Sequence, residues 1–441
     1  MLSLSAERPV RFIYSLLFYT LTPLVLARMA WRGRRESGYS QRWWERFAYY
    51  RDTDTRQNVI WFHAVSVGES EAAFPLIRAV SKRFPEVPIL VTTTTPTGSA
   101  RVKAVLADNV AHVYLPYDLP DAVARFLDHF HPRLAVVMET EIWPNLFHAC
   151  AVRGIPVSIV NARLSERSAK AYARIGGFTR ETLSAVGLVA AQTEADANRF
   201  LGLGAKREAV TVTGNIKYDL ELPKGYFQQA LVLRETLFGK RPVWIAASTP
   251  EGEEALVLRG FATLRAQHPE LLLVLVPRHP PRFDKVADLC LAEGLKLSRR
   301  SLGENAVNAD VFLLDTLGEL RLFYAASDIA FVGGSLVPVG GHNVLEPALA
   351  GLPVVFGTHM FNFEEAARRL IGAGGATEVG DANELAKRVG ELLQEPGRRA
   401  HMGECGRLFV EAGRGALGRV DEALAGLLAS TDRLRFKTES V

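Results

Sequence analysis

The sequence predicts an α/β protein in which two doubly wound domains face a cleft and an apolar helix precedes them. At 441 residues the chain is too long for one ordinary core, so two domains are expected. Apolar, β-branched runs alternate with helix-like stretches along most of the chain, which is the rhythm of βαβ units. Most of these runs are continuously apolar, as expected of strands in a parallel sheet that helices cover on both faces.

The N-terminal segment differs from the rest of the chain. Residues 12–27 carry no charge and would form a helix of roughly 24 Å, somewhat shorter than the ~30 Å core of a bilayer. No cleavage site of small residues follows, which argues against a signal peptide. Seven arginines and three tryptophans follow between residues 28 and 51, with only two acids. We therefore expect residues 1–35 to anchor the protein at an anionic, cytoplasmic membrane face. A helix buried against the domain is the alternative.

The strand-like runs form two series. The first lies at 59–63, 89–93, 112–115, 134–138, 157–160 and 210–213, and predicts an N-terminal domain over residues 36–222. The second lies at 243–247, 271–276, 311–314, 329–332 and 354–356, and predicts a C-terminal domain over 242–405. Residues 223–241 read as a linker, and 406–441 as a C-terminal helix that packs back, followed by a polar tail.

Composition removes several classes of function. A formal net charge of +4 is mild for this length and gives no concentrated basic face, so we expect no nucleic-acid partner. The three cysteines form no CxxC pair and the ten histidines no HExxH pair, so we expect no metal. The absence of GxGxxG after a first strand, and of GxxxxGK[ST], argues against a dinucleotide dehydrogenase and a P-loop enzyme.

Glu69 stands where the first strand gives way to a helix, in the stretch WFHAVSVGESEA (residues 61–72). Ser66 and Gly68 precede it in the turn. A carboxylate in this position could accept a proton from a substrate hydroxyl, or could simply cap the helix. Burial would raise its pKa and the helix N-terminus would lower it, and the residues alone leave that balance open.

Other loops of the first half carry polar groups at strand ends. Glu139, Glu141 and Trp143 follow a buried strand, where acids beside a tryptophan suit either sugar contacts or a structural ion pair. Thr95 lies in the hydroxyl-rich loop TTTTPTG, and Arg163 in NARLSERS. Because the carboxyl ends of parallel strands meet at one edge of a sheet, we expect these residues to lie together.

The richest loop of the second half is GGSLVPVGGHNVLEPA, residues 333–348. Its glycines let backbone approach a ligand, and the start of the following helix could bind a phosphate. Its candidate ligand-binding residues are Gly333, Gly334, Ser335, Gly341, His342, Asn343 and Glu346. Glu346 could accept hydrogen bonds from two ribose hydroxyls, or could complete a capping box with Asn343.

Two further loops of the second half offer groups to an anion. Arg278 and His279 lie in the proline-stiffened loop VPRHPPRF, which either recognises a phosphate or carboxylate or is a solvated charged loop. Ser248 and Thr249 end the first strand of this half, where they could cap the next helix or bind an anion.

Together these stretches resemble the Kdo transferases, which move 3-deoxy-D-manno-oct-2-ulosonic acid (Kdo) from CMP-Kdo to a lipid A precursor in lipopolysaccharide core biosynthesis. The resemblance rests on six motifs in order: HAVSVGE, METEIWPN, NARLSERS, TGNIKYD, PRHP and GGSLVPVGGHNVLEPA. It covers the chain from the N-terminal anchor to about residue 405. It implies a GT-B fold of two Rossmann-like domains, association with the cytoplasmic side of the inner membrane, and inverting transfer without a metal or other cofactor. Pro250 departs from the family, whose members often have histidine there.

The resemblance implies a role for each candidate residue. Glu69 would be the general base. The second-half residues named above, from Ser248 to Glu346, would bind CMP-Kdo, with Glu346 on the ribose. The first-half residues Ser66, Gly68, Thr95, Glu139, Glu141, Trp143 and Arg163 would bind the acceptor, lipid IVA. The alternatives are a nucleotide-sugar epimerase of GT-B fold and a non-catalytic, membrane-tethered nucleotide-sugar-binding protein.

Overall fold

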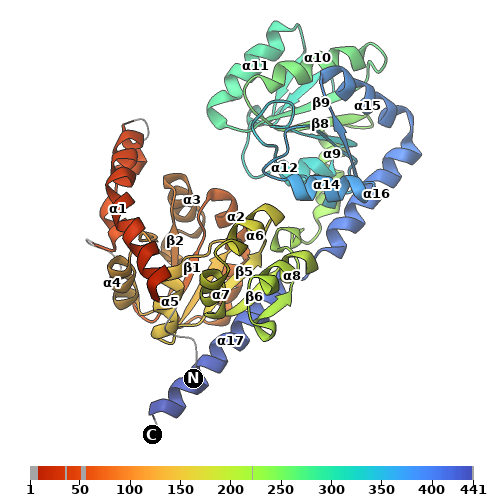
Figure 1. Ribbon diagram of the computed structural model, residues 1–441. Helices are drawn as coiled ribbons and strands as arrows, with labels where there is room; N and C mark the ends of the chain where they lie inside the picture. The colour runs from red at the N-terminus through yellow and green to blue at the C-terminus, as the bar shows by residue number, and fades with distance from the viewer. Residues whose placement is uncertain (1–7, 35–36, 51–55, 221, 440–441) are drawn as a thin grey trace. The chain divides into compact units, whose positions relative to one another are not determined.

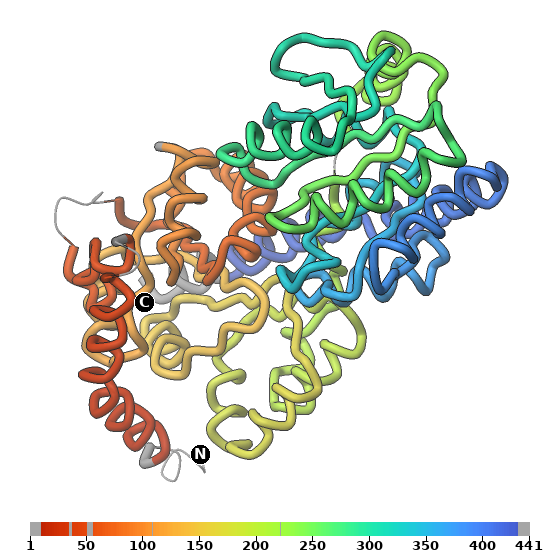
Figure 2. Tube along the Cα trace, turned by 90° about the horizontal axis from the view of Figure 1, so that it is seen from above, coloured from red at the N-terminus to blue at the C-terminus, as the bar shows by residue number. Residues whose placement is uncertain are grey.

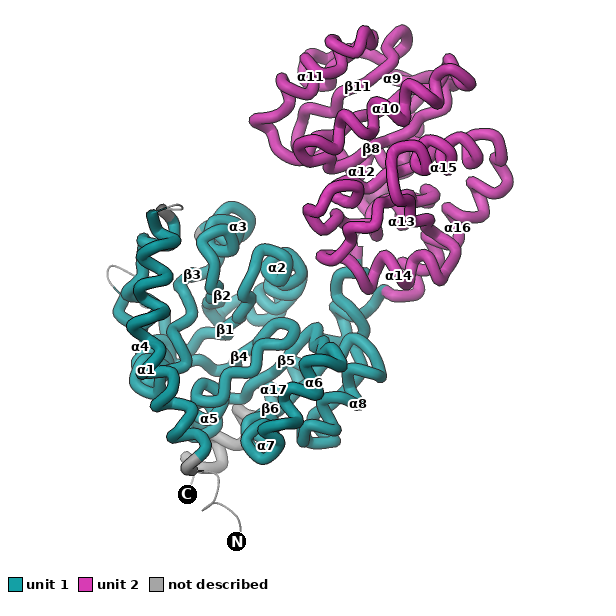
Figure 3. The backbone as a smooth tube through the Cα atoms, turned by 45° about the horizontal axis from the view of Figure 1, so that its top comes forward, with its two compact units in different colours: residues 1–219, 414–441 teal, residues 220–413 magenta. Residues whose placement is uncertain are grey.

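Two parallel seven-stranded sheets organise the chain, one in each of two units (Figure 3). The computed structural model describes residues 8–34, 37–50, 56–220 and 222–439. Unit 1 comprises residues 1–219 and 414–441, and unit 2 comprises residues 220–413. The two doubly wound sheets confirm the predicted α/β class.

The sheet of unit 1 changes winding direction between its first and fourth strands. Its order is β3 (Ala111–Tyr114), β2 (Ile89–Thr93), β1 (Ile60–His63), β4 (Leu134–Met138), β5 (Val157–Ala162), β6 (Val186–Ala191) and β7 (Val210–Val212). Strand β1 pairs in parallel with both β2 and β4. Loops after β1 and β4 therefore diverge at this point and leave room for a ligand at the carboxyl edge.

Helices cover both faces of this sheet, because successive strand residues point to opposite sides (Figure 1). Ile60 and Phe62 pack with α2 (Val67–Arg83), α3 (Pro96–Leu106) and α17 (Ala416–Glu439). Trp61 packs on the other face with α4 (Pro120–Phe130), α5 (Pro144–Val152), α7 (Gly176–Ser184) and α8 (Glu194–Gly202). Unit 1 also contains α1 (Arg8–Gly33), α6 (Glu166–Ala173) and the short 3₁₀ turns η1 (Ser37–Tyr39), η2 (Trp43–Phe47), η3 (Ala107–Asn109), η4 (Arg207–Ala209) and η5 (Ile216–Tyr218).

The sheet of unit 2 has its own change of direction, between β8 and β12. Its order is β10 (Leu297–Arg299), β11 (Val311–Leu313), β9 (Leu272–Pro277), β8 (Val243–Thr249), β12 (Ile329–Val332), β13 (Val354–Gly357) and β14 (Ala376–Val379). The helices of this unit are α9 (Tyr226–Leu237), α10 (Glu253–Arg265), α11 (Phe283–Ala292), α12 (Leu320–Ala325), α13 (Leu345–Leu349), α14 (Glu364–Gly372), α15 (Ala382–Gln394) and α16 (Pro396–Ala412), with turns η6 (Pro280–Arg282) and η7 (Arg300–Leu302).

Two of the expected domain boundaries need correction. Residues 223–241, predicted as a linker, instead hold helix α9, which buries Tyr226, Ala230 and Leu237 in unit 2. The expected boundary at residue 405/406 falls inside α16, so the units divide at 413/414 instead. Helix α17 then packs on unit 1, where Leu424 and Leu428 join the core beneath α2 and α3.

Helix α1 presents one face to unit 1 and another to solvent. Its stretch Val10–Gly33 is 24 residues long with a mean hydropathy of 1.6, which is enough in length and composition to cross a membrane. Apolar side chains such as Phe12 (68% exposed) and Leu24 (67%) project outward. Tyr19 on the docked face donates a 2.5 Å hydrogen bond to Asp121 of α4, and α1 lies alongside α4 in both views (Figures 1 and 2). The helix therefore combines an apolar outer face with a polar contact face.

One buried carboxylate joins α1 to the start of α5. Asp118, which is 2% exposed, accepts hydrogen bonds from the Tyr14 hydroxyl at 2.9 Å and from the backbone N–H groups of Asn145 and Leu146 at 3.0 and 2.8 Å. Ser15 of α1 also donates to the Asn145 side chain at 3.2 Å. Docking of α1 and capping of α5 thus depend on the same residue.

Candidate functional site

Glu69 lies in the first turn of α2, directly after β1 and therefore at the carboxyl edge of the unit 1 sheet. Ser66 is the N-cap of α2, and its hydroxyl accepts a 3.4 Å hydrogen bond from the Glu69 N–H. The Glu69 carboxylate in turn accepts hydrogen bonds from the Val65 N–H at 2.7 Å and the Ser66 hydroxyl at 3.3 Å. Glu69 therefore helps to cap α2, which is one of the two roles that the sequence allowed.

Burial nevertheless leaves the Glu69 carboxylate poised for proton transfer. Burial raises the pKa of Glu69 to about 7, against the Val65 N–H that lowers it, and the negative charges of Glu139 and Glu141 add to the rise. Of the two opposing effects on the pKa of Glu69 that the sequence left open, burial therefore outweighs the helix N-terminus. A carboxylate with a pKa near neutrality is well matched to general base catalysis, so capping and catalysis are compatible roles here.

The loop after β4 brings two more acids to this edge. Glu139, held at φ 56°, pairs through one oxygen with the Lys217 ammonium at 3.0 Å. The ion-pair interpretation is therefore realised for Glu139. Burial raises the pKa of Glu141, and Trp143 follows as the half-buried N-cap of α5. Three carboxylates and one ammonium thus share the switch point of the unit 1 sheet.

Lys217 is a site residue that sequence reasoning missed, although it stands in the motif TGNIKYD. Its turn, η5, is positioned by buried Asn161, whose side-chain oxygen accepts a 3.1 Å hydrogen bond from the Ile216 N–H. The signal available in the sequence was a basic residue in the loop that follows the predicted strand at 210–213, because the carboxyl ends of parallel strands meet at one edge of a sheet.

The remaining first-half candidates lie on neighbouring loops of the same edge. The Thr95 hydroxyl caps α3 by accepting the Gly98 N–H at 3.1 Å. The preceding residue, Thr94, donates its N–H to the Val65 carbonyl at 3.3 Å, so the loops after β1 and β2 are in contact. Arg163 has an exposed side chain, and its carbonyl accepts a hydrogen bond from the Thr140 hydroxyl, which links the loops after β4 and β5. Gly68 is exposed beside Glu69.

In unit 2 the glycine-rich loop after β12 is folded around a buried acid. Glu253, which is 0% exposed, accepts hydrogen bonds from the backbone N–H groups of Gly334, Ser335 and Leu336 at 2.6, 3.0 and 2.8 Å. Burial raises the pKa of Glu253, against these three donors that lower it. The backbone N–H groups of Gly334 and Ser335, two of the residues predicted to bind the donor, are therefore already occupied. Glu253 was missed, although it lies in AASTPEGEE.

Two hydroxyl groups predicted to contact the donor have structural roles instead. Ser335 is fully buried, where its hydroxyl donates to the Val332 carbonyl at 2.6 Å and accepts from the Gly357 N–H at 2.8 Å. Thr249 is also fully buried and donates to Glu254 at 3.2 Å. Neither hydroxyl is accessible to a ligand, because each lies inside the domain. Ser248, half-buried with φ 60°, remains at the strand end.

The loop requires glycine at two positions for steric reasons. A Cβ at Gly333 would lie 2.6 Å from the Glu253 carboxylate and 2.9 Å from the Ala247 carbonyl. Gly341 has a φ of 72°, and a Cβ there would lie 2.2 Å from the Met360 sulfur. Both glycines thus allow the close packing of this loop, as their sequence pattern indicated.

Basic groups from two loops meet at this edge. The pKa of His342 is lowered to about 4, mainly by burial and also by the nearby charges of Arg278 and His279, so His342 is neutral at neutral pH. Arg278 and His279 are exposed, and among the residues described here no carboxylate forms an ion pair with Arg278. Arg282 of the same loop instead forks onto buried Glu254 at 2.5 and 3.1 Å. Arg278 is thus the cation of this loop that can meet an anion.

Glu346 does not form the capping box that its spacing allowed. Its Oε1 pairs with the Arg321 guanidinium at 2.9 and 3.0 Å. Asn343 accepts the Leu345 N–H at 3.0 Å, at the start of a helix of only five residues. Both contacts to Arg321 use the same oxygen of Glu346, which leaves Oε2 for another donor.

Metal ligands do not gather in the described part of the chain. Across residues 8–34, 37–50, 56–220 and 222–439, no group of three or more His, Cys, Asp or Glu side chains could hold a metal ion. Whether the reaction needs a cofactor stays a prediction.

Comparison with known proteins places these motifs in a family. A family model described as 3-deoxy-D-manno-octulosonic-acid transferase (kdotransferase) matches residues 41–220. The 3-deoxy-D-manno-octulosonic acid transferase of Haemophilus influenzae is 44% identical over 417 residues, which cover 94% of this chain and 98% of that protein. The protein of the same name from Bordetella pertussis is 40% identical over 431 residues, with coverage of 94% and 98%.

A solved structure supports the fold at lower similarity. A Listeria monocytogenes protein assigned as a UDP-N-acetylglucosamine 2-epimerase has a TM-score of 0.51 at 16% identity, and covers 85% of this chain and 98% of its own. This similarity confirms the predicted GT-B fold of two Rossmann-like units and carries no information on activity.

Proposed function

Because the chain belongs to the 3-deoxy-D-manno-octulosonic acid transferase family, we propose that it transfers Kdo from CMP-Kdo to a sugar hydroxyl of a lipid A precursor. The observation that carries the chemistry is the Glu69 carboxylate, whose pKa is raised to about 7 at the switch point of unit 1. A sugar hydroxyl is too weakly acidic to ionise at neutral pH, so a positioned base must accept its proton as the new bond forms.

The proposed reaction is a single displacement. The acceptor oxygen attacks the anomeric C2 of Kdo while its proton passes to Glu69, and the bond from C2 to the CMP phosphate oxygen breaks. In-line attack inverts the configuration at C2. The leaving group is already an anionic phosphate, which Arg278 and His279 can stabilise without a metal.

The two substrates occupy different units in this proposal. Unit 2 binds the donor, with Arg278 on the phosphate and the open oxygen of Glu346 on the ribose. Unit 1 binds the acceptor at the edge that holds Glu69, Glu141 and Trp143. Lys217, paired with Glu139, adds a cation that suits an anionic, phosphorylated acceptor.

We further propose that α1 holds the protein on the cytoplasmic face of the inner membrane. The apolar outer face of α1 supports this, as do the arginines that follow it. Each basic residue near an anionic leaflet contributes about 1 kcal/mol of attraction. The acceptor, an anionic glycolipid, would be concentrated at the same surface.

The epimerase alternative is not favoured by any specific observation. Likeness to an epimerase is confined to the fold at 16% identity, whereas relatives at 44% and 40% identity carry the transferase name. A binding protein without activity would give no reason for a carboxylate with a pKa near 7 beside two other acids.

The test is mass spectrometry of a tetraacylated lipid A precursor after incubation with the purified protein and freshly made CMP-Kdo. We expect a mass gain of one or more Kdo units, which also gives the number of sugars added. If the acceptor gains no mass while the protein is folded and CMP-Kdo stays intact, the proposed function is wrong. Release of free Kdo without a product would instead indicate hydrolysis.

A further inference from the structure

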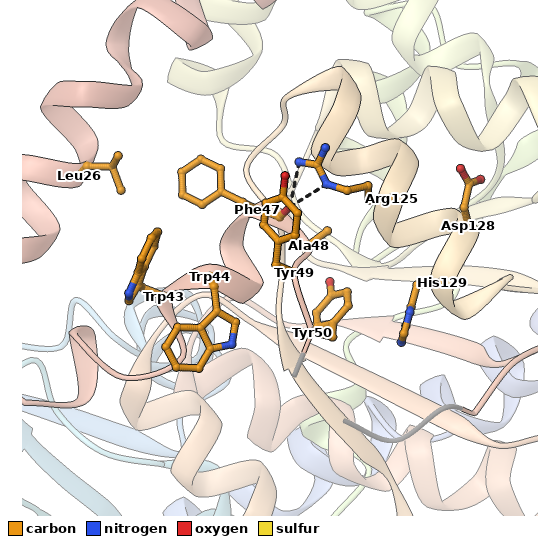
Figure 4. Close-up of a pocket in the computed structure, with 10 residues that line it drawn as sticks. All are labelled: Leu26, Trp43, Trp44, Phe47, Ala48, Tyr49, Tyr50, Arg125, Asp128 and His129. Carbon is orange, nitrogen blue, oxygen red and sulfur yellow. Dashed lines mark hydrogen bonds between the residues drawn. The ribbon is translucent and has the colours of Figure 1, made fainter. Parts of the chain in front are cut away.

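A large apolar cavity opens in unit 1 between α1, η2 and α4 (Figure 4). Its volume of about 970 Å³ lies at the upper end of the roughly 300–1,000 Å³ typical of small-molecule sites. Five aromatic residues of one short segment line it: Trp43, Trp44, Phe47, Tyr49 and Tyr50. Leu26 of α1 lies at one end of the cavity, and Asp128 and His129 of α4 lie at the other (Figure 4). None of these residues belongs to the candidate site described above.

The Arg125 guanidinium, the cation of the cavity, is already engaged by the protein, whereas the Tyr50 hydroxyl and His129 Nε2 are buried without a hydrogen-bond partner in the described part of the chain. Arg125 donates to the Phe47 carbonyl at 3.0 and 3.2 Å, and its guanidinium lies 4.6 Å from the centre of the Tyr49 ring. It also pairs with Asp121 at 2.8 Å. A ligand entering here would meet mainly aromatic surface, since the cation is satisfied by the protein. This chemistry suits a hydrocarbon chain better than a charged headgroup.

The aromatic segment is fixed to the edge of the sheet that carries Glu69. Arg46 donates to the Thr94 carbonyl at 2.8 Å, and Glu45 accepts the Tyr114 N–H at 2.9 Å, so η2 sits on the carboxyl ends of β2 and β3. The Thr94 N–H donates to Val65, four residues before Glu69. With strands ~4.8 Å apart, the ends of β3 and β1 are separated by roughly 10 Å, within the length of one glycolipid.

The cavity is also continuous with a membrane-type surface. Leu26 belongs to α1, the helix whose outer face is apolar and exposed. Trp43 is 44% exposed and Tyr49 57% exposed at the rim. Tryptophan and tyrosine are the side chains enriched where hydrocarbon meets water. A chain that leaves a bilayer beside α1 can therefore enter the cavity without crossing a polar surface.

We propose that this cavity binds one fatty acyl chain of the acceptor glycolipid and thereby places the acceptor headgroup at Glu69. The proposal rests on the proposed function, because it names the acceptor of that same edge. The acceptor is preferred over a bilayer phospholipid because η2 spans from the lipid-facing helix to the loops of the reactive edge. A phospholipid chain would gain nothing from that connection.

Photolabelling of the full-length protein in detergent micelles tests this assignment without any donor sugar. The probe is a tetraacylated, bisphosphorylated glucosamine disaccharide with a diazirine at the end of one acyl chain. We expect cross-links on peptides that contain residues 43–50 or 125–129. Excess unlabelled acceptor should suppress them, and phosphatidylglycerol of equal chain length should not. Cross-links confined to other peptides, or equal suppression by phosphatidylglycerol, would overturn the proposal.

Two variants sharpen the result. Leu26→Trp fills the cavity from the α1 side and should lower labelling at least about fivefold, the effect of losing roughly 1 kcal/mol of contact. Val152→Ala removes an apolar side chain that is 70% exposed in the same unit but does not line the cavity, and should label as the wild type does. Equal labelling of both variants would contradict the assignment, with circular dichroism confirming that each is folded.

Failure of the cavity and failure of the enzymatic proposal are distinguishable. Labelling needs only the acceptor, whereas transfer also needs CMP-Kdo and Glu69. A protein that adds Kdo but is not labelled at the cavity refutes the acyl site alone. A protein that is labelled there but adds no Kdo to any acceptor refutes the proposed function and leaves a glycolipid-binding cavity.

Discussion

The raised pKa of Glu69 leads to a specific dependence of activity on pH. A general base must be ionised, and burial raises the pKa of this carboxyl from 4.5 to about 7. Roughly one tenth of the enzyme is then active at pH 6 and nine tenths at pH 8, so kcat/KM should rise about tenfold over that interval. With a pKa of 4.5 the carboxyl would be almost fully ionised at both values, and the profile would be flat.

Substitution by glutamine separates catalysis from capping. In Glu69→Gln the side-chain oxygen can still accept the Val65 N–H, while the base is gone, so kcat should fall by ~10²–10⁴. Glu71→Gln is the matched control. Glu71 lies on the same helix and pairs with Arg101 at the surface, where ion pairs contribute little. A Glu69→Gln enzyme that keeps turnover within threefold of the wild type would refute the assignment.

Stability should move in the opposite direction to activity. Because folding raises the pKa of this acid, the folded state holds a proton that the unfolded state has lost, and stability falls as pH rises from about 4.5 to about 7. Above pH 7 the carboxylate is ionised, and the folded state bears the full free-energy cost of burying its charge. Glu69→Gln removes it, so the free energy of unfolding at pH 8 should rise by on the order of 1–3 kcal/mol, with little change near pH 4. A residue that only caps would lose about 1 kcal/mol instead.

Three further predictions concern residues around the two edges. Lys217→Met leaves the charge of Glu139 uncompensated, so the midpoint of the pH–rate profile should move up by roughly half a unit; an unchanged midpoint would place that ion pair outside the site. Glu253→Gln turns an amide N–H₂ toward backbone donors and should cost about 2–4 kcal/mol in urea unfolding, an effect that a ligand-binding role alone would not produce. Arg278→Ala should raise the KM for CMP-Kdo about 10- to 100-fold with little change in Tm. Arg282→Ala should instead destabilise the protein by about 3–5 kcal/mol, because it leaves the buried Glu254 carboxylate without its ion-pair partner. The reverse pattern in the two arginine variants would exchange their roles.

The strands that sequence analysis found are those whose burial shows in composition. Runs such as Leu134–Met138 and Ile329–Val332 are continuously apolar, and each forms a fully buried central strand. Strand β6, Val186–Ala191, was not predicted, because Gly187 and its alanines have little intrinsic preference for strands. Pairing with β5 and β7 makes it one. Edge strands β10 and β14 were missed for a related reason, since three or four residues with polar side chains leave no periodic signal.

The candidate site divides along similar lines. Residues at strand ends were predictable, because topology brings the carboxyl ends of parallel strands together whatever the loops contain. Glu253 was not, since its carboxylate serves a loop 81 residues away and only the folded chain shows the encounter. For Ser335 the hydroxyl was correctly seen in a glycine-rich loop, but its burial follows from the close approach of Gly357. The sequence thus shows that a side chain lies at the carboxyl edge of a sheet, but it does not show whether that side chain faces solvent or the domain interior.

Asp118 gives the anchor a mechanical role. Its carboxylate holds Tyr14 of α1 and the first turn of α5, directly after the loop with Glu141 and Trp143. If α1 left unit 1, the buried Asp118 carboxylate would lose the hydrogen bond from the Tyr14 hydroxyl, at a free-energy cost of about 1–3 kcal/mol. In the proposed membrane-bound state, α1 and unit 1 are therefore held in a fixed position relative to each other. This arrangement keeps the reactive edge at one height above the lipid, and so sets which hydroxyl of a glycolipid can reach the base.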